Sequence, residues 1–264
     1  MLRERIEGVR QRIAQACARA GRNPSAVTLV AVTKGVPAER IREAVAHGLT
    51  ELGENRVQEA LAKQAALGCG LRAVGKGPEP RAPSPERVHW HLIGHLQRNK
   101  ARHAVDGFDC IHSADSLELI DALEAAASSK LHAANRASVQ IFIQVNISGE
   151  QTKFGCRPED AQRLAEALSR CRRLTPRGLM TMAPWSANSE DARPHFRRLR
   201  ELRDELVNAG SLRPEACSLS MGMSEDFEVA IEEGADLVRI GTAIFGARDQ
   251  GNSEFGMRSA GWPT

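Results

Sequence analysis

The sequence contains no tyrosine and few aromatic residues of any kind. Phenylalanine, tryptophan and tyrosine together make up 4% of its 264 residues. Proteins that bind single-stranded nucleic acids stack the bases on aromatic side chains, so this composition argues against such a surface. The net charge is only +3, and no basic run carries interleaved aromatic residues. We therefore expect no nucleic acid among the partners.

The chain also lacks cysteine pairs, a signal-like beginning and a long apolar run. The first residues include the charged side chains of Arg3, Glu4 and Arg5, and no apolar stretch reaches the length of a membrane span. The cysteines form no C-x-x-C pair, so we expect free, mostly buried thiols in a reducing compartment. They are Cys17, Cys69, Cys110, Cys156, Cys171 and Cys217. We expect a cytoplasmic protein that does not bind a membrane.

Strand-like and amphipathic segments alternate regularly along the chain. This alternation predicts a parallel sheet with helical crossovers. Eight such units in about 250 residues have the size of a closed (β/α)8 barrel of the TIM type. The predicted strands are residues 27–34, 49–53, 88–94, 108–112, 139–146, 174–180, 216–221 and 236–241.

An open, doubly wound sheet is the alternative architecture. It would normally carry a glycine-rich turn after its first strand, whereas the sequence there is T-K-G-V-P. We therefore predict one α/β barrel domain over residues 1–249, with an extra amphipathic helix at residues 2–20. Residues 68–87, rich in glycine and proline, are predicted to form an inserted loop, and residues 250–264 a flexible tail.

The first predicted strand, V-T-L-V-A-V-T-K (27–34), ends in a lysine. Its apolar and β-branched residues are typical of a strand buried on both faces of a parallel sheet. A lysine desolvated at the end of such a strand loses its proton readily and becomes a nucleophilic amine that can form a Schiff base. Alternatively, Lys34 extends its ammonium group into water. This stretch alone leaves both interpretations open.

Two loops near the C-terminus have the small residues of an anion site. The active site of a barrel lies at the C-terminal ends of the strands, and the last two loops often bind phosphate. Here they are S-M-G-M-S (220–224) and G-T-A-I-F-G (241–246), where backbone N–H groups and hydroxyls can donate to an anion. Arg239, inside the last strand, needs a partner if it points inward. A carboxylate or an aromatic ring nitrogen would serve.

A lysine amine, a phosphate cradle and an inward arginine together suggest pyridoxal 5'-phosphate (PLP). Its aldehyde would join Lys34, its phosphate would lie between residues 220–224 and 241–242, and Arg239 would face its pyridine nitrogen. Because arginine does not readily give up a proton, the pyridine would stay largely unprotonated. The ring would then be a weaker electron sink than one paired with aspartate.

The sequence resembles the pyridoxal-phosphate homeostasis proteins, the YggS/PROSC family. The motifs that carry the resemblance are V-A-V-T-K (30–34), G-E-N-R-V-Q-E (53–59), W-H-L-I-G-H-L-Q-R-N-K (90–100), I-H-S-A-D-S (111–116), R-G-L-M-T-M (177–182), S-M-G-M-S-E-D (220–226) and V-R-I-G-T-A-I-F-G-A-R-D (238–249). The resemblance runs from about residue 2 to 249. It implies a barrel like that of alanine racemase, a PLP protein of fold type III.

The resemblance also implies which residues bind the cofactor. Lys34 would carry the Schiff base, Arg239 would face the ring nitrogen, and Ser220, Gly241 and Thr242 would hold the phosphate. The residues that would line the pocket beside them are Asn55 and His91. Val36 stands where the family often has a second lysine, so the resemblance does not carry over that lysine's role in releasing the cofactor. Lys153 matches another family lysine near the pocket and is an alternative amine.

Four functions are compatible with the residues, and the resemblance favours the first. A carrier would buffer and deliver PLP in intracellular vitamin B6 homeostasis, with little or no turnover, as a monomer that contacts apo PLP-enzymes transiently. An amino-acid racemase of related fold pairs its lysine with a tyrosine, which this chain lacks. A metal hydrolase would use His89, His91 and His95. An aldolase without cofactor would use Lys34 and the phosphate loops.

Overall fold

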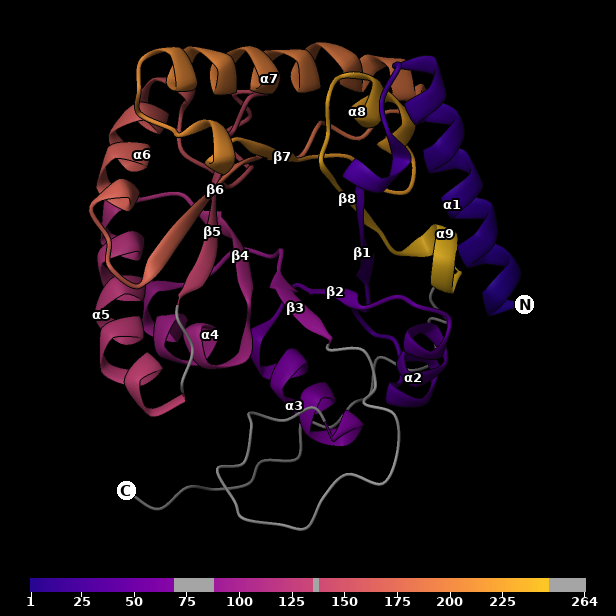
Figure 1. The fold of residues 1–264 in the computed structure, drawn as a ribbon, viewed down its shortest axis with the longest axis horizontal. Helices are drawn as coiled ribbons and strands as arrows, with labels where there is room; N and C mark the ends of the chain where they lie inside the picture. Colours follow the sequence, from indigo (N-terminus) through magenta and orange to yellow (C-terminus); the bar gives the residue numbers. More distant parts are fainter. Residues whose placement is uncertain (69–87, 135–137, 247–264) are drawn as a thin grey trace.

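The computed structural model describes residues 1–68, 88–134 and 138–246 of the chain. Its centre is a closed barrel of parallel strands, in which each strand pairs with the next and β8 returns to β1. Figure 1 shows the strands inside a ring of helices. The predicted (β/α)8 barrel is therefore confirmed. The strands are β1 (Thr28–Val32), β2 (Glu51–Glu54), β3 (His89–Leu92), β4 (Cys110–Ala114), β5 (Val139–Gln144), β6 (Leu174–Met180), β7 (Ser218–Ser220) and β8 (Leu237–Ile240).

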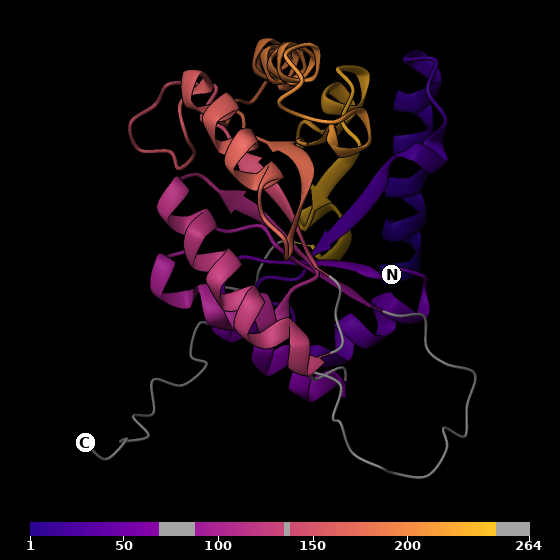
Figure 2. The ribbon, with the colours of Figure 1, turned by 60° about the vertical axis from the view of Figure 1, so that its left-hand side comes forward.

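The helices lie outside the barrel and cover it with their apolar faces. In α1, Leu2, Ile6, Val9 and Ile13 recur every three or four residues and are all buried. Neighbouring helices such as α5 and α6 pack side by side around the sheet (Figure 2). The helices are α1 (Leu2–Arg19), α2 (Ala38–Ala46), α3 (Val57–Leu67), α4 (Ala101–Gly107), α5 (Leu117–Ala134), α6 (Ala161–Ser169), α7 (Arg193–Asn208), α8 (Phe227–Glu232) and α9 (Thr242–Phe245).

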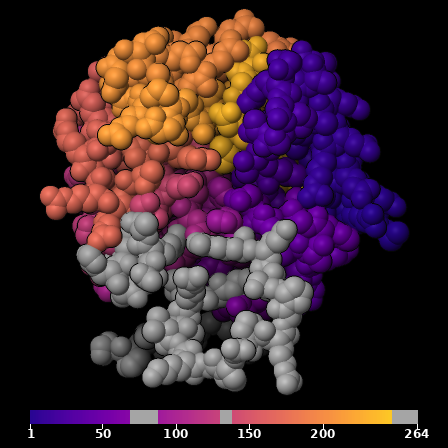
Figure 3. Space-filling view, viewed as in Figure 1, coloured from indigo at the N-terminus to yellow at the C-terminus, as the bar shows by residue number. Residues whose placement is uncertain are grey.

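The predicted N-terminal helix packs against the last helices of the described chain. Helix α1 packs against α8 and α9, and Figure 3 shows its indigo atoms beside the yellow segment. Arg12 pairs with Glu228 at 2.6 Å, and Arg19 pairs with Glu232 at 2.7 Å. The extra helix therefore covers the last unit of the barrel from outside.

Alternation along the strands divides the apolar residues into two sets. Outward residues pack against the helices in one large cluster. Inward residues fill the barrel with a small cluster made of Val30, Cys110, Phe142, Met180 and Leu237. The polar side chains on the same inward positions are brought together with this cluster, and they form the candidate site.

Several element boundaries differ from the predicted ones. The sequence pattern predicts single helices over residues 158–172 and 188–209, whereas short 3-10 turns, Pro158–Asp160 and Ser189–Ala192, precede α6 and α7. It also predicts a helix that follows residues 113–116 and ends near residue 128, whereas α5 continues to Ala134. Helix α9 was not predicted, because its four residues are too few to show a helical period.

Parts of the predicted organisation lie outside the described residues. These are the inserted loop and the tail, apart from Gly68, which ends α3 with φ of +70°.

The described cysteines are free, and Cys17, Cys110 and Cys156 are buried. Within the described residues, no helix is both long and apolar enough to cross a membrane.

Candidate functional site

Lys34 lies in the turn after β1, at the C-terminal end of the barrel. The turn is closed by the Val36 N–H, which donates to the Thr33 carbonyl at 2.9 Å, and by Gly35 with φ of +71°. Val30 points into the barrel, so alternation puts Lys34 on the same inward column. The side chain of Lys34 is half-buried, and its amine has no hydrogen bond or ion pair within the described residues. Its amine is therefore available to a ligand.

A polar cluster behind the sheet fixes the backbone on both sides of Lys34. Lys63 of α3 donates to the Thr33 carbonyl at 2.6 Å, to Glu54 at 2.6 Å and to Glu59 at 2.7 Å. Glu59 also accepts from the Gly35 N–H at 2.7 Å. Burial raises the pKa of Glu54, although Lys63 and Thr33 act in the opposite direction. For Glu59, the bonds from Lys63 and Gly35 outweigh burial and lower the pKa.

Asn55 follows β2 and lies beneath the chain that follows β3. A Cβ atom on Gly94 would be 2.3 Å from the Asn55 carbonyl oxygen and 2.8 Å from its Cα. Glycine is therefore required at position 94 for the two loops to approach this closely. Asn55 is half-buried at this end of the barrel, and its role in lining the pocket stays a prediction.

Arg239 points into the barrel from β8 and is 3% exposed. It donates to the Ser220 hydroxyl at 2.6 Å and to the Thr181 carbonyl at 2.8 Å. Burial lowers the pKa of Arg239 to about 10, and Asp226 acts in the opposite direction. The guanidinium is therefore still charged at neutral pH. Among the described residues, two of its five N–H groups donate to protein atoms, and the others have no acceptor there.

The loops after β7 and β8 meet at the hydroxyl of Ser224. Its oxygen accepts from the Gly241 N–H at 3.3 Å and from the Ala243 N–H at 3.4 Å. These two backbone donors converge on one oxygen atom, which is the arrangement that binds an anion. Thr242, between them, is exposed. The two predicted phosphate loops are thus brought together.

Ser220 and His91 lie deeper than the mouth of the barrel. Besides accepting from Arg239, the fully buried Ser220 oxygen is 2.8 Å from His112 Nδ1. His112 Nε2 is 2.8 Å from His91 Nδ1, and His91 Nε2 is 2.6 Å from Glu51. Burial lowers the pKa of His112 well below its usual value, and the nearby Arg239 guanidinium lowers it further. His112 is therefore neutral.

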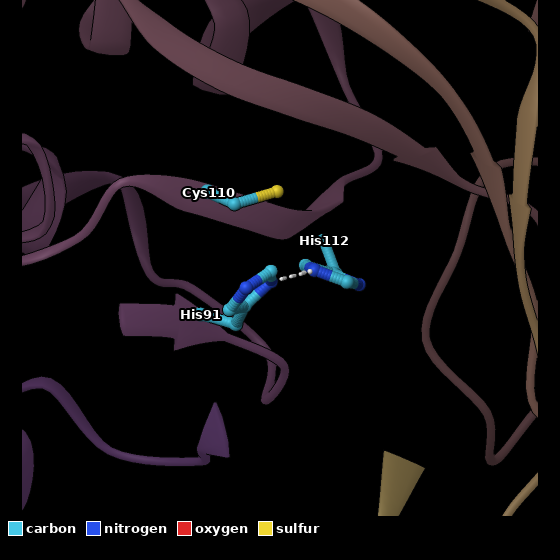
Figure 4. A group of neighbouring side chains, drawn as sticks. All are labelled: His91, Cys110 and His112. Atoms are coloured by element: carbon cyan, nitrogen blue, oxygen red, sulfur yellow. Dashed lines mark hydrogen bonds between the residues drawn. The ribbon is translucent and has the colours of Figure 1, made fainter. Parts of the chain in front are cut away.

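The histidine triad considered for a metal site is not brought together. In the described part of the chain, the compact group of potential metal ligands is His91, Cys110 and His112 (Figure 4), without His89 or His95. His95 instead stacks on the ring of Phe154 at 3.8 Å between centroids.

Lys153, the alternative amine, lies in the loop after β5. Its Nζ is 3.3 Å from Glu150, and its side chain is 22% exposed. The residue next to it, Phe154, contacts His95 after β3. Lys153 is thus at the same end of the barrel as Lys34. Its role as an alternative amine stays a prediction.

Four residues of this region were only weakly indicated by the sequence. His112 stands in I-H-S-A-D-S, a motif to which the sequence analysis assigned no role of its own. Glu51 lies in the short predicted strand 49–53, and Lys63 and Glu59 carried no predicted role. Their partners lie far away in the sequence, so only strand alternation at Glu51 and His112 pointed to the barrel interior.

Comparisons with known proteins show the class to which this fold belongs. The family model described as "Alanine racemase, N-terminal domain" matches residues 6–249. The alanine racemase of Clostridium difficile 630 has a TM-score of 0.64 and 15% identity, covering 94% of this chain and 56% of that one. At that identity, the likeness shows the fold alone. The class is the barrel found in the N-terminal domain of alanine racemase.

Closer relatives define the family. The "Pyridoxal phosphate homeostasis protein" of Pseudomonas aeruginosa is 44% identical over 248 residues, covering 94% of this chain and 96% of the relative. The protein of the same name from Aquifex aeolicus is 42% identical over 245 residues, with coverage of 93% and 97%. PipY of Synechococcus elongatus PCC7942, solved with PLP bound, has a TM-score of 0.74 and 37% identity, covering 93% and 100%. This chain belongs to the pyridoxal phosphate homeostasis protein family.

Proposed function

We propose that the protein binds PLP and holds and delivers it in intracellular vitamin B6 homeostasis, with little or no turnover. The observation that carries the proposal is the placement of Arg239 in β8 and of Lys34 in the turn after β1, the strand that pairs with β8. The convergent N–H groups at Ser224 lie in the loops after β7 and β8. An amine, a guanidinium and an anion-binding group thus share one end of the barrel.

These residues fit the three parts of the cofactor. In the proposal, Lys34 forms the covalent bond to the aldehyde, and Arg239 donates to the ring nitrogen. The backbone of Gly241 and Thr242 holds the phosphate, and Ser224 adds its hydroxyl. The remaining wall is formed by Asn55 and His91. Direct contact of Ser220 with the phosphate stays a prediction, since the Ser220 oxygen already accepts from Arg239.

When bound, PLP supplies an aldehyde that reacts reversibly with amines. The residues around the cofactor favour retention of PLP over catalytic turnover. Arg239 stays a cation at neutral pH and donates hydrogen bonds without giving up a proton. It therefore does not increase the electron demand of the ring by protonating it. The half-buried Lys34 amine remains open to exchange with solvent and partners.

Racemisation is the second candidate, and one feature of the sequence disfavours it. A racemase needs a base on each face of the cofactor. Lys34 supplies one, and no tyrosine exists in the chain to supply the other. We further propose that the protein acts as a monomer in the cytoplasm and passes PLP on through transient contact with apo PLP-enzymes.

The test is a binding titration followed by a transfer assay. The purified apo protein is titrated with PLP, and the loaded protein is then mixed with an apo PLP-enzyme and, separately, with L-alanine. We expect one PLP per chain, transfer that restores activity in the recipient, and no D-alanine above the level given by free PLP. Failure to bind PLP would refute the proposal, and sustained formation of D-alanine would replace the carrier with the racemase.

A further inference from the structure

Five side chains on five strands form one hydrogen-bonded chain through the barrel interior. The contacts join Glu51 to His91 at 2.6 Å, His91 to His112 at 2.8 Å, His112 to Ser220 at 2.8 Å and Ser220 to Arg239 at 2.6 Å. The carboxylate end is 30% exposed, whereas His112 and Ser220 are fully buried. The chain therefore connects a carboxylate near solvent to the guanidinium in the cofactor site.

The donor at each contact follows from the chemistry of the two ends. Arg239 can only donate, so the Ser220 oxygen accepts from it. The single Ser220 proton then goes to His112 Nδ1. A neutral His112 accepting at Nδ1 carries its proton on Nε2 and donates to His91 Nδ1. His91 in turn carries its proton on Nε2 and donates to Glu51. Every proton points from Arg239 toward the carboxylate.

The opposite orientation would require one more proton. If His112 donated from Nδ1 to Ser220, then His91 would donate from Nδ1 to His112. His91 and Glu51 would then need an additional proton between their facing atoms. The Ser220 proton would have no partner in the chain. The orientation with three protons satisfies every member, and a buried polar chain is stabilising when all of its members are satisfied.

We propose that Glu51, His91 and His112 are positioning residues for Arg239. Acting through Ser220, they fix the guanidinium in the orientation in which its remaining N–H groups face the ring nitrogen. The inference rests on the proposed PLP function, because Arg239 is assigned to that nitrogen only there. It adds Glu51 and His112, which act on the cofactor through other side chains, and gives the wall residue His91 a second role in positioning Arg239.

A metal ion in the group of His91, Cys110 and His112 is the competing interpretation. Figure 4 shows the two rings hydrogen-bonded to each other, with the Cys110 sulfur beside them. All four ring nitrogens are already engaged, so coordination would break the chain. Burial also raises the pKa of the Cys110 thiol, which opposes formation of the thiolate ligand. The geometry favours the hydrogen-bonded chain.

The first experiment uses the apo protein labelled with 15N-histidine. The His91 and His112 signals are assigned with His91→Gln and His112→Gln variants. We expect both rings to be neutral and protonated on Nε2, and Glu51→Ala to shift the His91 signals. A His112 ring protonated on Nδ1 would overturn the inference. As a further test, Zn²⁺ alone is added to the apo protein. Binding of one zinc ion per chain that the Cys110→Ala variant loses would establish the metal site instead.

The second experiment uses the PLP-loaded protein. Ser220→Ala and Glu51→Ala are expected to shift the visible absorption band and to speed PLP dissociation by roughly tenfold, the effect of one lost hydrogen bond. Glu51→Gln keeps an oxygen acceptor and should restore the native band. The control is Glu7→Ala, on the exposed face of α1. An unchanged band in the Glu51→Ala protein would refute the positioning role.

The two experiments separate this inference from the proposed function. A native protein that does not bind PLP would refute the function, while the histidine tautomers of the apo protein would be unaffected. Normal PLP binding with an unchanged band in the Glu51→Ala protein would refute the inference alone.

Discussion

Lys63 Nζ lies 2.6 Å from the carbonyl oxygen of Thr33, the residue that precedes Lys34. The same amine pairs with Glu54, which is fully buried, while Lys63 itself is 12% exposed. Lys63→Met would leave the Glu54 carboxyl buried without its partner. We predict a loss of about 3 kcal/mol in the free energy of unfolding, measured by urea denaturation. Because the Thr33 backbone is also released, PLP affinity should fall roughly tenfold.

The matched control for this prediction is Arg3→Met, which breaks the exposed Arg3–Glu7 pair. It should leave both measurements unchanged. The double variant Glu54→Leu with Lys63→Met should regain part of the lost stability, since it replaces a buried ion pair with apolar groups. If the Lys63→Met protein has the same urea midpoint of unfolding as the native protein, the contacts of Lys63 do not stabilise the turn that carries Lys34.

Gly94 allows the loops after β2 and β3 to touch. In Gly94→Ala, the added Cβ would be 2.3 Å from the Asn55 carbonyl oxygen, so the backbone must move. We predict destabilisation of about 2 kcal/mol or more by thermal or urea unfolding, with weaker PLP binding. Gly8→Ala is the control, because it has no atom within 4 Å and lies inside helix α1. It should stabilise the protein by about 0.5–1 kcal/mol. Equal stability in the two variants would contradict the packing described.

Ser224 is predicted to act on the phosphate and not on the aldehyde. In Ser224→Ala, the affinity for PLP should fall about tenfold, while the weaker affinity for pyridoxal, which lacks the phosphate, should stay the same. Both ligands are titrated by absorbance. The control is Ser169→Ala, an exposed hydroxyl at the end of α6 that bonds to its own helix at Glu166. An equal loss for both ligands would remove Ser224 from the phosphate site.

Glu233, directly after α8, forms ion pairs with three arginines of α7. Its carboxylate lies 3.2 Å from Arg193, 3.1 Å from Arg197 and 3.1 Å from Arg200. Burial alone would raise the pKa of Glu233, but the bonds from Arg197 and Arg193 and the charge of Arg200 lower it below 4.5. The unfolded chain therefore takes up the proton at higher pH than the folded one. The stability contributed by Glu233 is present above about pH 4.5 and is lost as the pH falls through the folded-state pKa.

Urea unfolding at several pH values between about 7 and 3 checks this sign. Glu233→Gln should cost about 2 kcal/mol at pH 7, and the difference from the native protein should shrink as the pH falls. The exposed variant Glu7→Gln serves as the control and should run parallel to the native curve. A Glu233→Gln curve parallel to the native one across the whole range would contradict the assigned shift.

The sequence predicted the barrel well because strand composition and alternation are local properties. The gathering of Lys34, Arg239 and the loops after β7 and β8 at one end of the barrel could be predicted for the same reason, because parallel strands bring their C-terminal ends to one edge. Ser220 and Ser224 could not be told apart, because the backbone between them, with Gly222 at φ of +92°, decides which hydroxyl reaches the mouth. The role of Lys63 in holding the turn that carries Lys34 could not be predicted, because its contact with Thr33 joins residues that are distant in sequence.

The most direct test of the account is the visible spectrum of the purified protein with PLP, before and after borohydride reduction. It is followed by mass spectrometry of the reduced peptide that contains Lys34. We predict an absorption band that reduction abolishes, a PLP adduct on Lys34, and neither in Lys34→Ala. A protein that stays colourless with PLP would contradict the central claim, as would an adduct found on Lys153 with none on Lys34.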